Sequence, residues 1–437
     1  MPKTKTDKQL FTVGRVFFLL IVIPLSLVAF LIANGIYKVG ESARTTTMTV
    51  LDKKCQEEIK ARALSIADEV TDFLRERQRD LLIASILPAT EETYKEFVQG
   101  NRKSLWVKQQ GGVQQLLVPL YVEMAFVGRT GDELIKISQG EVVPKSRLLN
   151  VANPANTLYY SDYFAKTKAL NKGEIYVSPV LGWYVSKERF QKGDRFNGIV
   201  RFATPIYDKQ GFAGIVTLAL DYRHLARFTD NIIPTQSAYV IEADATTGDY
   251  AFMVDNRGFV ISHPNDYHIA GLNTDGTPVP PLTKDNEVAL MQKGMEVLNF
   301  YEMGYINPTL PKIAKDAAQG KAGMMTYQFG GRTQFIAYAP IKFFCSTYPE
   351  PAGFGWVGMN VDMVKFSEIA SATSQKIQRE AKSWVTTIIV IIALSVVLLF
   401  FIVAILARGI SRSIAAEVPA GSEQETLFPD EEEEEER

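Results

Sequence analysis

The chain has 437 residues, 46% of them hydrophobic, and its 47 basic side chains nearly balance its 49 acidic ones. A chain of this length can build two or three domains, and its near-zero net charge gives no reason to expect a nucleic-acid partner. Two long uncharged segments, one near each end, exclude an ordinary soluble protein.

The first uncharged segment covers residues 16–37, which are 22 residues without a charged side chain. As a helix it is long enough to cross about 30 Å of hydrocarbon. A cleavable signal peptide would have a shorter apolar stretch, of about 7 to 15 residues, and then a small-residue cleavage site. Neither feature is present, so we predict a retained transmembrane helix. Four basic residues precede it and place residues 1–15 in the cytoplasm: Lys3, Lys5, Lys8 and Arg15.

Residues 40–87 are predicted to form one long helix after this span. From Val50 to Leu87 the sequence contains no glycine or proline, and its apolar residues recur mostly at steps of three and four. Pro88 ends the pattern. Such a helix acts as a stiff lever or covers a sheet, and both roles stay open.

From about residue 114 the pattern changes to β-strands. A hairpin is predicted with its turn at Gly128 to Gly131, followed by a loop and a short helix. Two further strands are joined by a turn at Asp208 to Gly211. Residues 114–230 therefore form the first predicted module.

The end of this module is repeated later in the chain. The sequence GIVTLALD at 214–221 returns in similar form as GWVGMNVD at 355–362. The elements before it also recur, beginning with a hairpin that turns at Asp255 to Gly258. We therefore predict two tandem copies of one small antiparallel module, the second at 236–370.

The second copy differs from the first by an insertion at residues 271–322. Its first part is rich in turn residues, residues 284–304 are expected to be helical, and residues 306–323 are expected to return to the sheet. From its position, we expect the insertion to pack over the pocket of the second module and to close it.

A second uncharged segment covers residues 383–407, which are apolar on every face of a helix. Arg408 and Arg412 follow it, so residues 38–382 are predicted to lie outside the cytoplasm. The sequence ARGISRSI at 407–414, which leads into the tail at 408–437, is similar to the start of a HAMP linker. The tail then runs into seven consecutive acidic residues, and we expect a short, solvated cytoplasmic tail.

The order of these elements resembles the double Cache sensor domain. The resemblance rests on DYFAKTKALNKGEIYVSPV, ATPIYDKQGFAGIVTLALD, MVDNRGFVISHP and the final strand, between two spans and after a long helix. It covers roughly residues 38–382 and implies an extracytoplasmic ligand-binding domain, as in bacterial chemoreceptors, histidine kinases and cyclic-dinucleotide enzymes. The predicted fold class is α+β, with two tandem PAS-like antiparallel-sheet modules on a long N-terminal helix, flanked by two transmembrane helices.

The resemblance also implies a small-molecule pocket in the membrane-distal first module. Aromatic and polar residues gather in that part of the sequence, and pockets for small solutes are mostly apolar with a few placed polar groups. The alternative is that these aromatic residues form the core, with their hydroxyls bonded locally. The predicted ligand-binding residues are Tyr160, Asp162, Tyr163, Tyr176, Trp183, Tyr184, Arg201 and Asp221.

Amino-acid-binding members of that family carry an arginine for the ligand carboxylate and an aspartate for its ammonium group. Aligned by eye, these positions are Ser161 and Ala219 here. The departure argues against the standard amino-acid mode, because a bidentate guanidinium is hard to replace. Arg201 and Arg189 stay open as sources of the missing charge, and a carboxylate or another small anion stays open as the ligand.

Other chemistry is sparse. His263 and His268 lie around Pro264 at a spacing that suits a turn after a strand and not a helical metal pair. We found no nucleophile elbow, phosphate loop or zinc motif, so we predict no enzyme, no metal and no cofactor. Cys55 and Cys345 are expected to be packed thiols, while a disulfide, or a crosslink between two copies at Cys55, stays open.

The sequence thus predicts a two-pass receptor of the bacterial inner membrane. It would bind a small molecule, an organic anion among the candidates, outside the membrane and pass a signal to a separate cytoplasmic protein of the chemotaxis or two-component type. A homodimer through the 40–87 helices is expected. The alternative is a membrane-anchored binding protein without signal output, and a third class, an extracytoplasmic enzyme, is disfavoured by the missing catalytic residues.

Overall fold

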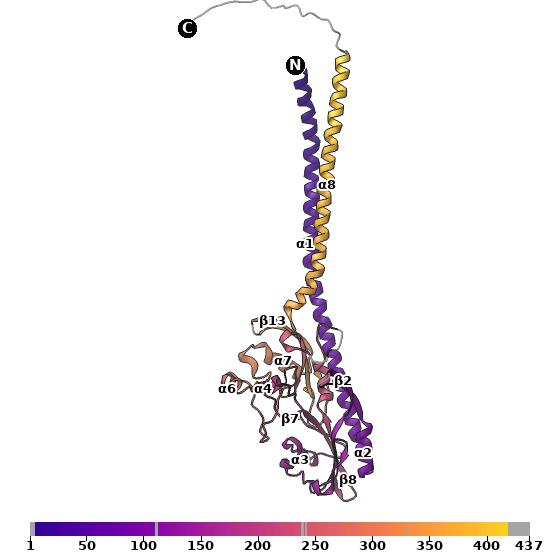
Figure 1. Cartoon of the computed structure of the whole chain (residues 1–437), viewed down its shortest axis with the longest axis vertical. Coiled ribbons are helices and arrows are strands. Elements are labelled where there is room, and N and C mark those ends of the chain that lie inside the picture. Colours follow the sequence, from indigo (N-terminus) through magenta and orange to yellow (C-terminus); the bar gives the residue numbers. More distant parts are fainter. Residues whose placement is uncertain (1–4, 110–111, 237–239, 241–242, 330, 418–437) are drawn as a thin grey trace, which may run out of the picture. The chain divides into compact units, whose positions relative to one another are not determined.

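The computed structural model describes residues 5–109, 112–236, 240, 243–329 and 331–417, and its elements are shown in Figure 1. The chain divides into two compact units. One comprises Met1–Val50 and Ala370–Arg437, and the other comprises Leu51–Ile369. Helices α1 (Lys5–Ile86) and α8 (Met363–Glu417) contribute residues to both.

The described residues of the first unit are helical. By length and composition, two helical segments are apolar and long enough to cross a membrane, Phe18–Ile86 and Gln375–Leu406. Large apolar side chains on both, such as Phe30 and Leu394, are well over half exposed, as expected of residues that face lipid. The prediction of an apolar helix on each side of the domain is confirmed.

The first module of the second unit is built on a seven-stranded sheet. The strand order is β5-β4-β3-β9-β8-β6, β7 also pairs with β8, and the neighbours are antiparallel. Helix α2 (Glu91–Gly100) and a separate hairpin, β1-β2, precede this sheet. The strands are β1 (Arg102–Gln109), β2 (Gly112–Pro119), β3 (Tyr121–Gly128), β4 (Glu133–Ser138), β5 (Glu141–Val142), β6 (Tyr176–Val177), β7 (Leu181–Gly182), β8 (Gly198–Asp208) and β9 (Gly211–Asp221).

Side chains on this sheet alternate between two faces, because successive residues of a strand point to opposite sides. Val216 and Leu218 on β9 belong to the hydrophobic core that includes α1. Ile215, between Gly214 and Val216, belongs instead to a cluster with Tyr163 of α3 (Tyr163–Lys168). We call this second side the α3 face. Three short helices complete the module: α3, α4 (Lys187–Gln191) and α5 (Arg223–Asp230).

The second module has a five-stranded antiparallel sheet in the order β11-β10-β14-β13-β12. Its strands are β10 (Tyr250–Asp255), β11 (Val260–Ser262), β12 (Gly323–Phe329), β13 (Arg332–Ile341) and β14 (Gly355–Asp362). The insertion carries α6 (Glu287–Gln292) and α7 (Thr309–Ala318). Short 3-10 turns occur at Lys145–Arg147, Pro154–Asn156, Leu158–Tyr160, Ala245–Thr247, Asp266–His268 and Met303–Tyr305.

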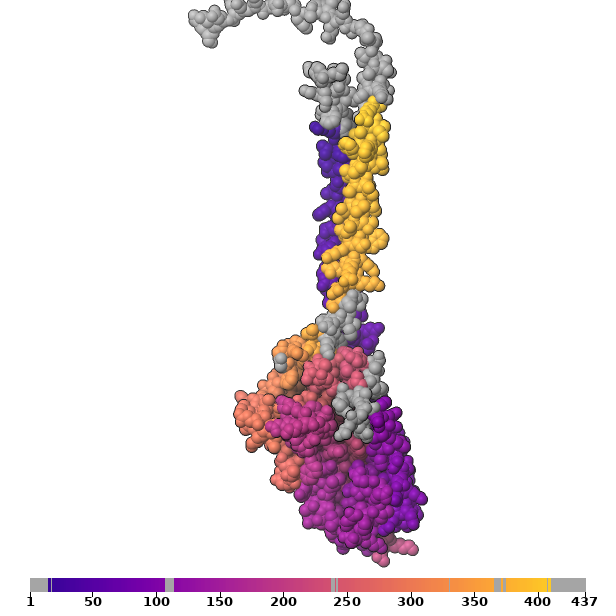
Figure 2. Space-filling model, in the orientation of Figure 1, coloured from indigo at the N-terminus to yellow at the C-terminus, as the bar shows by residue number. Residues whose placement is uncertain are grey.

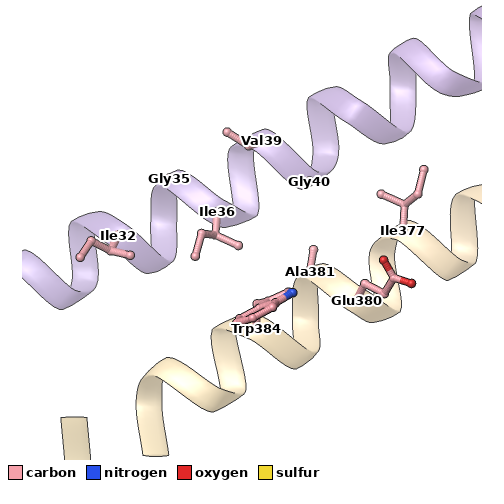
Figure 3. A pocket seen from close by; sticks show the side chains of 9 residues that line it. All are labelled: Ile32, Gly35, Ile36, Val39, Gly40, Ile377, Glu380, Ala381 and Trp384. Carbon is pink, nitrogen blue, oxygen red and sulfur yellow. The ribbon is translucent and has the colours of Figure 1, made fainter. Parts of the chain in front are cut away.

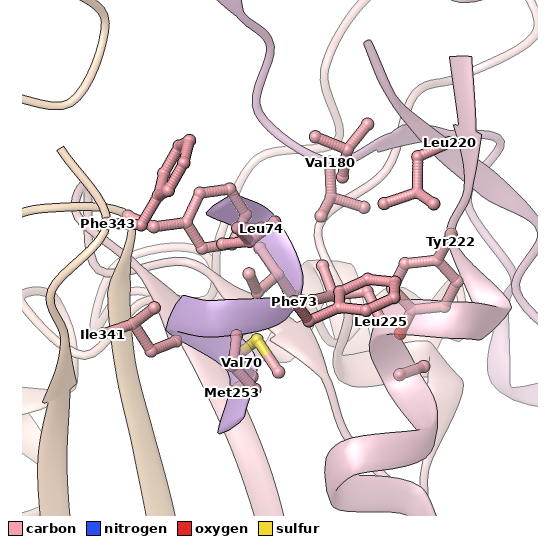
Figure 4. Close-up of a cluster of buried hydrophobic side chains, with 14 of the residues drawn as sticks. Val70, Phe73, Leu74, Val180, Leu220, Tyr222, Leu225, Met253, Ile341 and Phe343 are labelled. Carbon is pink, nitrogen blue, oxygen red and sulfur yellow. The ribbon is translucent and has the colours of Figure 1, made fainter. Parts of the chain in front are cut away.

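Both modules share one hydrophobic core around the second half of α1. Figure 4 shows α1 side chains between residues of the first module and residues of the second. From α1 these are Val70, Phe73 and Leu74; the first module adds Leu220, Tyr222 and Leu225, and the second adds Met253, Ile341 and Phe343. The helix predicted at 40–87 therefore covers a sheet face in each module.

Most predicted turns are confirmed. The hairpin turns lie between β3 and β4, between β8 and β9, and between β10 and β11, where glycine supplies a backbone conformation with positive φ at Gly131, Gly211 and Gly258. The long helix ends at Ile86, before Pro88. The first strand, however, begins at Arg102 and not near residue 114, so the sequence prediction missed α2 and β1.

The insertion was predicted wrongly in two places. Residues 284–304 contain the short α6 and the start of the 3-10 turn at Met303–Tyr305. Gly294 with φ of 67° ends the helical stretch of α6, and buried Val297 and Phe300 follow in non-helical chain. Residues 306–323 reach the sheet only at Gly323, where β12 begins, because Thr309–Ala318 form α7. Its buried residues Leu310, Ile313, Ala314 and Ala317 have the three- and four-residue spacing of a helix, and Pro311 lies in the first turn, where proline is tolerated.

Candidate functional site

The α3 face of the first module contains a row of three residues on neighbouring strands. Arg201 on β8 is opposite Ala219 on β9, and Ala219 is opposite Glu123 on β3. Opposite residues of paired strands project to the same side of a sheet, so the Arg201 and Glu123 side chains meet over the small methyl group of Ala219. The distance from Arg201 Nη2 to Glu123 Oε2 is 2.7 Å, and the two residues are only 2% and 8% exposed.

Lys136 and Glu133 on β4 extend this ion pair. Lys136 Nζ lies 3.2 Å from Glu123 Oε1 and 2.9 Å from Glu133 Oε1. The backbone N–H of Leu149 donates a hydrogen bond to Glu133 Oε2 at 3.1 Å. We call these four residues, Arg201, Glu123, Lys136 and Glu133, the Arg201 cluster. With two positive and two negative side chains, the cluster has no net charge.

Pairing keeps the charges of this cluster stable despite burial. Burial acts to raise the pKa of the Glu123 carboxyl, but Arg201 and Lys136 outweigh it and hold this pKa below its ordinary value. Burial acts to lower the pKa of Arg201, and the charge of Glu123 raises it. Loss of either partner would therefore leave a buried charge without compensation.

Tyr163 covers Arg201, and Tyr176 lies in the same buried group. The Arg201 guanidinium carbon lies 4.4 Å from the centroid of the Tyr163 ring. Burial raises the pKa of both tyrosines, so their hydroxyls stay protonated and can donate hydrogen bonds. Two buried polar atoms on this face have no hydrogen-bond partner among the described residues, Nε of Arg201 and Oγ1 of Thr167. Buried polar atoms without a hydrogen-bond partner are rare in native proteins, so a bound molecule is a candidate partner for these two.

An aromatic group borders this region. Tyr159 and Tyr160 make edge-to-face contacts with Trp183, with ring centroids 5.3 and 6.1 Å apart. Both tyrosines have positive φ, 62° and 53°, a conformation that costs a non-glycine residue about 1–2 kcal/mol. Burial raises the pKa of Tyr159, and the charges of Asp221 and Glu123 raise it further, so Tyr159 lies within electrostatic reach of the cluster.

Of the predicted ligand-binding residues, Tyr163, Tyr176 and Arg201 lie together, and Tyr160 and Trp183 lie in the bordering aromatic group. Asp162, Asp221 and Tyr184 form ion pairs or hydrogen bonds outside the Arg201 cluster.

Asp162 is exposed and pairs with Lys166 at 3.0 Å. Asp221 is buried at the end of β9, where its Oδ2 lies 2.6 Å from Nη2 of Arg223. Tyr184 is buried against the second module, and its hydroxyl donates a hydrogen bond to the Tyr267 carbonyl oxygen at 2.8 Å.

The two arginines considered as replacements for a ligand clamp differ in position. Arg201 lies in the cluster, whereas Arg189 on α4 is exposed and pairs with Asp194 at 2.7 Å. Glu123, Lys136 and Thr217, which the sequence reasoning missed, lie on the same face as Arg201, and Thr217 Oγ1 is 3.4 Å from Arg201 Nη1. The signal that could have found Glu123 is an acidic residue inside the otherwise apolar strand YVEMAFVG.

The corresponding face of the second module is filled by large side chains. Trp356 and Asn360 on β14 take the places that Ile215 and Ala219 take on β9 in the repeated sequence. Trp356 packs 4.8 Å from Phe300 of the insertion, which stacks on Phe252 at 5.4 Å. Helix α7 packs its apolar residues into the same cluster. The expected cover of the second module by the insertion is thus present.

Asn360 completes this filled face with a satisfied polar network. Its Nδ2 donates to Gln334 Oε1 at 2.9 Å and to the Gly248 carbonyl oxygen at 3.1 Å, and its Oδ1 accepts from the Tyr327 hydroxyl at 2.8 Å. Both polar atoms of the Asn360 side chain thus have hydrogen-bond partners among the described residues.

His263 and the two cysteines are packed within the fold and take part in no metal site or disulfide among the described residues. His263 follows β11, and its Nδ1 accepts a hydrogen bond from the backbone N–H of Asn265 at 2.9 Å, so the predicted turn is confirmed. Cys55 and Cys345 are free and partly buried, and burial raises the pKa of both thiols. Among the residues that the structure describes, no group of three or more His, Cys, Asp or Glu side chains is placed to hold a metal ion.

A cleft of about 480 Å³ lies in the first unit, between α1 and α8 (Figure 3). A Cβ atom on Gly40 would lie 2.8 Å from Cβ of Ala381, so glycine allows the two helices to approach closely there. The lining is mostly apolar and consists of Ile32, Gly35, Ile36, Val39, Gly40, Ile377, Glu380, Ala381 and Trp384. We assign this cleft to helix packing, because close approach at small residues is the usual way for membrane helices to associate.

Comparison with known proteins identifies one family. The family described as "Cache domain" (dCache_1) matches residues 47–359, well over half of the chain. No protein of curated function matches the sequence.

Similarity to solved structures is low in sequence. The ligand-binding domain of the Pseudomonas fluorescens chemoreceptor CtaA, in complex with L-isoleucine, is 13% identical with a TM-score of 0.40, and the match covers 74% of this chain and 98% of that chain. The ligand-binding domain of the Pseudomonas aeruginosa amino acid chemoreceptor PctB, in complex with L-Arg, is 13% identical with a TM-score of 0.38, covering 72% of this chain and 97% of that chain.

Proposed function

The chain belongs to the Cache domain family, and on that premise we propose that it is a membrane receptor whose first module binds a small molecule on the α3 face of its sheet. The single observation that carries the choice of module is the contrast between the two sheet faces. In the first module the sheet face has Ala125, Ala203 and Ala219 around the buried Arg201 cluster, with Val127 and Ile215 as its larger strand residues. In the second module the corresponding face holds Phe252, Tyr338 and Trp356.

The polar atoms of the α3 face favour a ligand with hydrogen-bond acceptors. Arg201 Nε has no partner among the described residues, and the protonated hydroxyl of Tyr163 can add a donor beside it. A ligand oxygen that accepts from Arg201 Nε would satisfy a buried donor, which otherwise costs about 1–3 kcal/mol.

Charge balance favours a ligand without net charge. The Arg201 cluster is already neutral, so a simple anion would bring an uncompensated charge into a buried region. A neutral polar molecule or a zwitterion would not. We therefore rank these two classes above the plain organic anion that the sequence left open.

The remaining parts of the function rest on the two apolar helices and the family. We propose a two-pass protein of the bacterial inner membrane with the Cache domain outside, which forms a homodimer and passes its signal to a separate cytoplasmic protein. The ligand shifts the receptor between two states only by as much as its affinity for them differs. A binding protein of the same architecture without signal output is the second candidate, and neither candidate includes catalysis.

A thermal-unfolding screen tests the binding proposal. The full chain in lipid nanodiscs is heated with neutral amides, polyols, zwitterions, amines, organic acids, purines and sugars. A compound at about 100 times its dissociation constant adds about 2.7 kcal/mol to the stability of the folded state, which raises Tm measurably. A panel that leaves Tm unchanged in a well-folded sample would contradict a small-molecule receptor.

Matched variants locate the site. Thr217→Val and Tyr163→Phe each remove one hydroxyl from the α3 face, and Tyr338→Phe removes one hydroxyl from the second module. We expect the first two to abolish or weaken the Tm shift of a hit by about tenfold in affinity, the equivalent of 1.4 kcal/mol, and the third to preserve it. The reverse pattern would move the site to the second module.

A further inference from the structure

We infer that residues 182–196, which we call the strap, couple the candidate site of the first module to the second module. The inference rests on the proposed function, because it names how occupancy of that site is passed on. The strap belongs to the first module by sequence, yet most of its contacts described below are made with the second. Figure 1 places α4, which lies in the strap, beside α6 of the insertion, and in Figure 2 the magenta surface of the first module adjoins the orange surface of the insertion.

Backbone hydrogen bonds attach the strap at its start. The N–H of Leu272 donates to the carbonyl oxygen of Gly182 at 2.9 Å, and the N–H of Tyr184 donates to the carbonyl oxygen of Leu272 at 2.9 Å. This is a parallel bridge between Trp183 and Leu272. A Cβ atom on Gly271 would lie 2.7 Å from Cα of Tyr184, so the two backbones come this close only because residue 271 is glycine.

The Tyr184 side chain is fixed at two further points. Its hydroxyl donates to the carbonyl oxygen of Tyr267 at 2.8 Å and accepts from the backbone N–H of Glu296 at 2.8 Å. The residue is buried, in a cluster with Val279 and Val297 of the second module. A buried tyrosine with both hydroxyl functions satisfied holds its position tightly.

Contacts of α4 and the strap's end complete the attachment. Lys187 Nζ lies 2.8 Å from Glu296 Oε1, and the Lys187 backbone N–H donates to the carbonyl oxygen of Gly294 at 3.0 Å. The Phe190 ring meets the Tyr267 ring edge-on at 5.4 Å. At the far end, the Phe196 N–H donates to Asp266 Oδ2 at 2.5 Å.

The strap is equally tied to the candidate site. Immediately before and within it, Leu181 and Gly182 pair with Ile199 and Gly198 of β8, the strand that carries Arg201. Trp183 packs against Tyr159 of the bordering aromatic group. Trp183 and Tyr184 are consecutive, so their side chains point to opposite sides of an extended backbone. One contacts the site's aromatic group and the other is held by the second module, and a displacement of one moves the other.

The test needs no ligand. Backbone hydrogen exchange of the full chain in nanodiscs is measured by mass spectrometry, with Tyr163→Phe as the perturbation in the site. With the strap intact, we expect exchange to change about threefold or more both in peptides from 121–138 and in peptides from 265–298. With Tyr184→Phe and Lys187→Met added, the change at 265–298 is lost and the change at 121–138 persists.

Two results would overturn the coupling. In the first, exchange at 265–298 does not change although the strap is intact. In the second, the change at 265–298 persists after the strap is altered, and the modules are then coupled through the shared core around α1. If the double strap variant is unfolded, Glu296→Gln alone weakens the Lys187 contact and serves in its place. A flat ligand screen contradicts the proposed function, whereas this exchange experiment contradicts only the coupling, so the two failures are distinguishable.

Discussion

At the scale of single residues, Ala219 lies at the centre of the candidate site. Its methyl group is too short to cover the sheet, and the long side chains of Arg201 and Glu123 meet above it from the two neighbouring strands. Asn360, at the matching place in the second module, fills that space with its own amide and its own hydrogen bonds. The opposite residues differ as well, because Asn360 lies between Ile336 and Tyr250 where Ala219 lies between Arg201 and Glu123.

Glu123→Gln is expected to lower the free energy of unfolding by about 3–5 kcal/mol, because it leaves Arg201 buried with a neutral partner. Chemical denaturation of the full chain measures the loss. Glu141→Gln is the matched control, since Glu141 is exposed and pairs with Lys95 at the surface, and we expect a change below about 1 kcal/mol. An equal decrease in the free energy of unfolding in the two variants would show that the buried pair stabilises the fold no more than the surface pair does.

The same pair predicts an acid limit. The pKa of Glu123 is held below its ordinary value of 4.5, so its stabilising effect is complete above that pH and is lost as pH falls through the folded-state pKa. Stability measured from pH 6 down to pH 3 should therefore fall less steeply in Glu123→Gln than in the unmodified chain. Parallel curves would contradict this assignment.

A second pH dependence belongs to His263 and His268, whose rings lie 4.9 Å apart in the second module. Burial lowers both pKa values, and the charge of His268 lowers that of His263 further. Tyr250 and Phe252 pack on His263, and Glu296 and Lys187 are the charged side chains near His268.

Because the unfolded histidines bind protons near their ordinary pKa of 6.5 and the folded ones do not, stability is complete above pH 6.5 and falls below it. A single such histidine contributes up to about 1.4 kcal/mol per pH unit. His263→Asn preserves an acceptor for the Asn265 N–H and should reduce the slope between pH 6.5 and 5.5. Identical slopes in the variant and the unmodified chain would show that His263 does not contribute to the pH dependence. Between pH 7.5 and 8.5 neither histidine is protonated, so the two slopes should agree there.

At the scale of elements, α7 covers one face of the second sheet with its apolar residues. Its buried residues pack with Phe252, Phe300 and Trp356 over the second sheet. Ile313→Ala should lower the free energy of unfolding by about 2–4 kcal/mol, through lost burial and the cavity left behind. The neighbouring exposed Lys312→Ala should change it by less than about 0.5 kcal/mol. A small effect of Ile313→Ala, measured by denaturation, would mean that α7 is not part of the folded core.

The elements also show what a single sequence can and cannot predict. Period-two strands with glycine turns, such as the β8-β9 and β10-β11 hairpins, were predictable because local residues determine them. Helix α7 was missed because Pro308 and Pro311 look like breakers until both are placed at the helix start. Arg201 was predicted as a site residue from its type, but its partner Glu123 lies 78 residues away and becomes adjacent only through the sheet register.

At the scale of the whole molecule, one helix serves both modules. Phe73 of α1 packs 5.3 Å from Phe228 of the first module, while its neighbour Leu74 shares the core with Ile341 and Phe343 of the second. The modules of the second unit therefore have no separate cores on this side.

Phe73→Ala should consequently destabilise both modules together, by about 3–5 kcal/mol. Hydrogen exchange of the full chain should become faster in peptides of β8 and β9 and, to a similar extent, in peptides of β13 and β14. The exposed neighbour Asp72→Ala is the control and should leave both unchanged. Faster exchange confined to the first module would show that the modules unfold independently.

The alternation of side chains along β9 has a consequence for how such a protein can diverge. Val216, Leu218 and Leu220 face the shared core and are restricted by packing, whereas Thr217 and Ala219 between them face the candidate site. Substitutions at the second set can accumulate and alter chemical preference while the first set preserves the fold. Insertion or deletion of one residue would exchange the two sets and destroy both. Replacement of single residues can therefore change the chemistry of the α3 face without changing the core, whereas a change in strand length cannot.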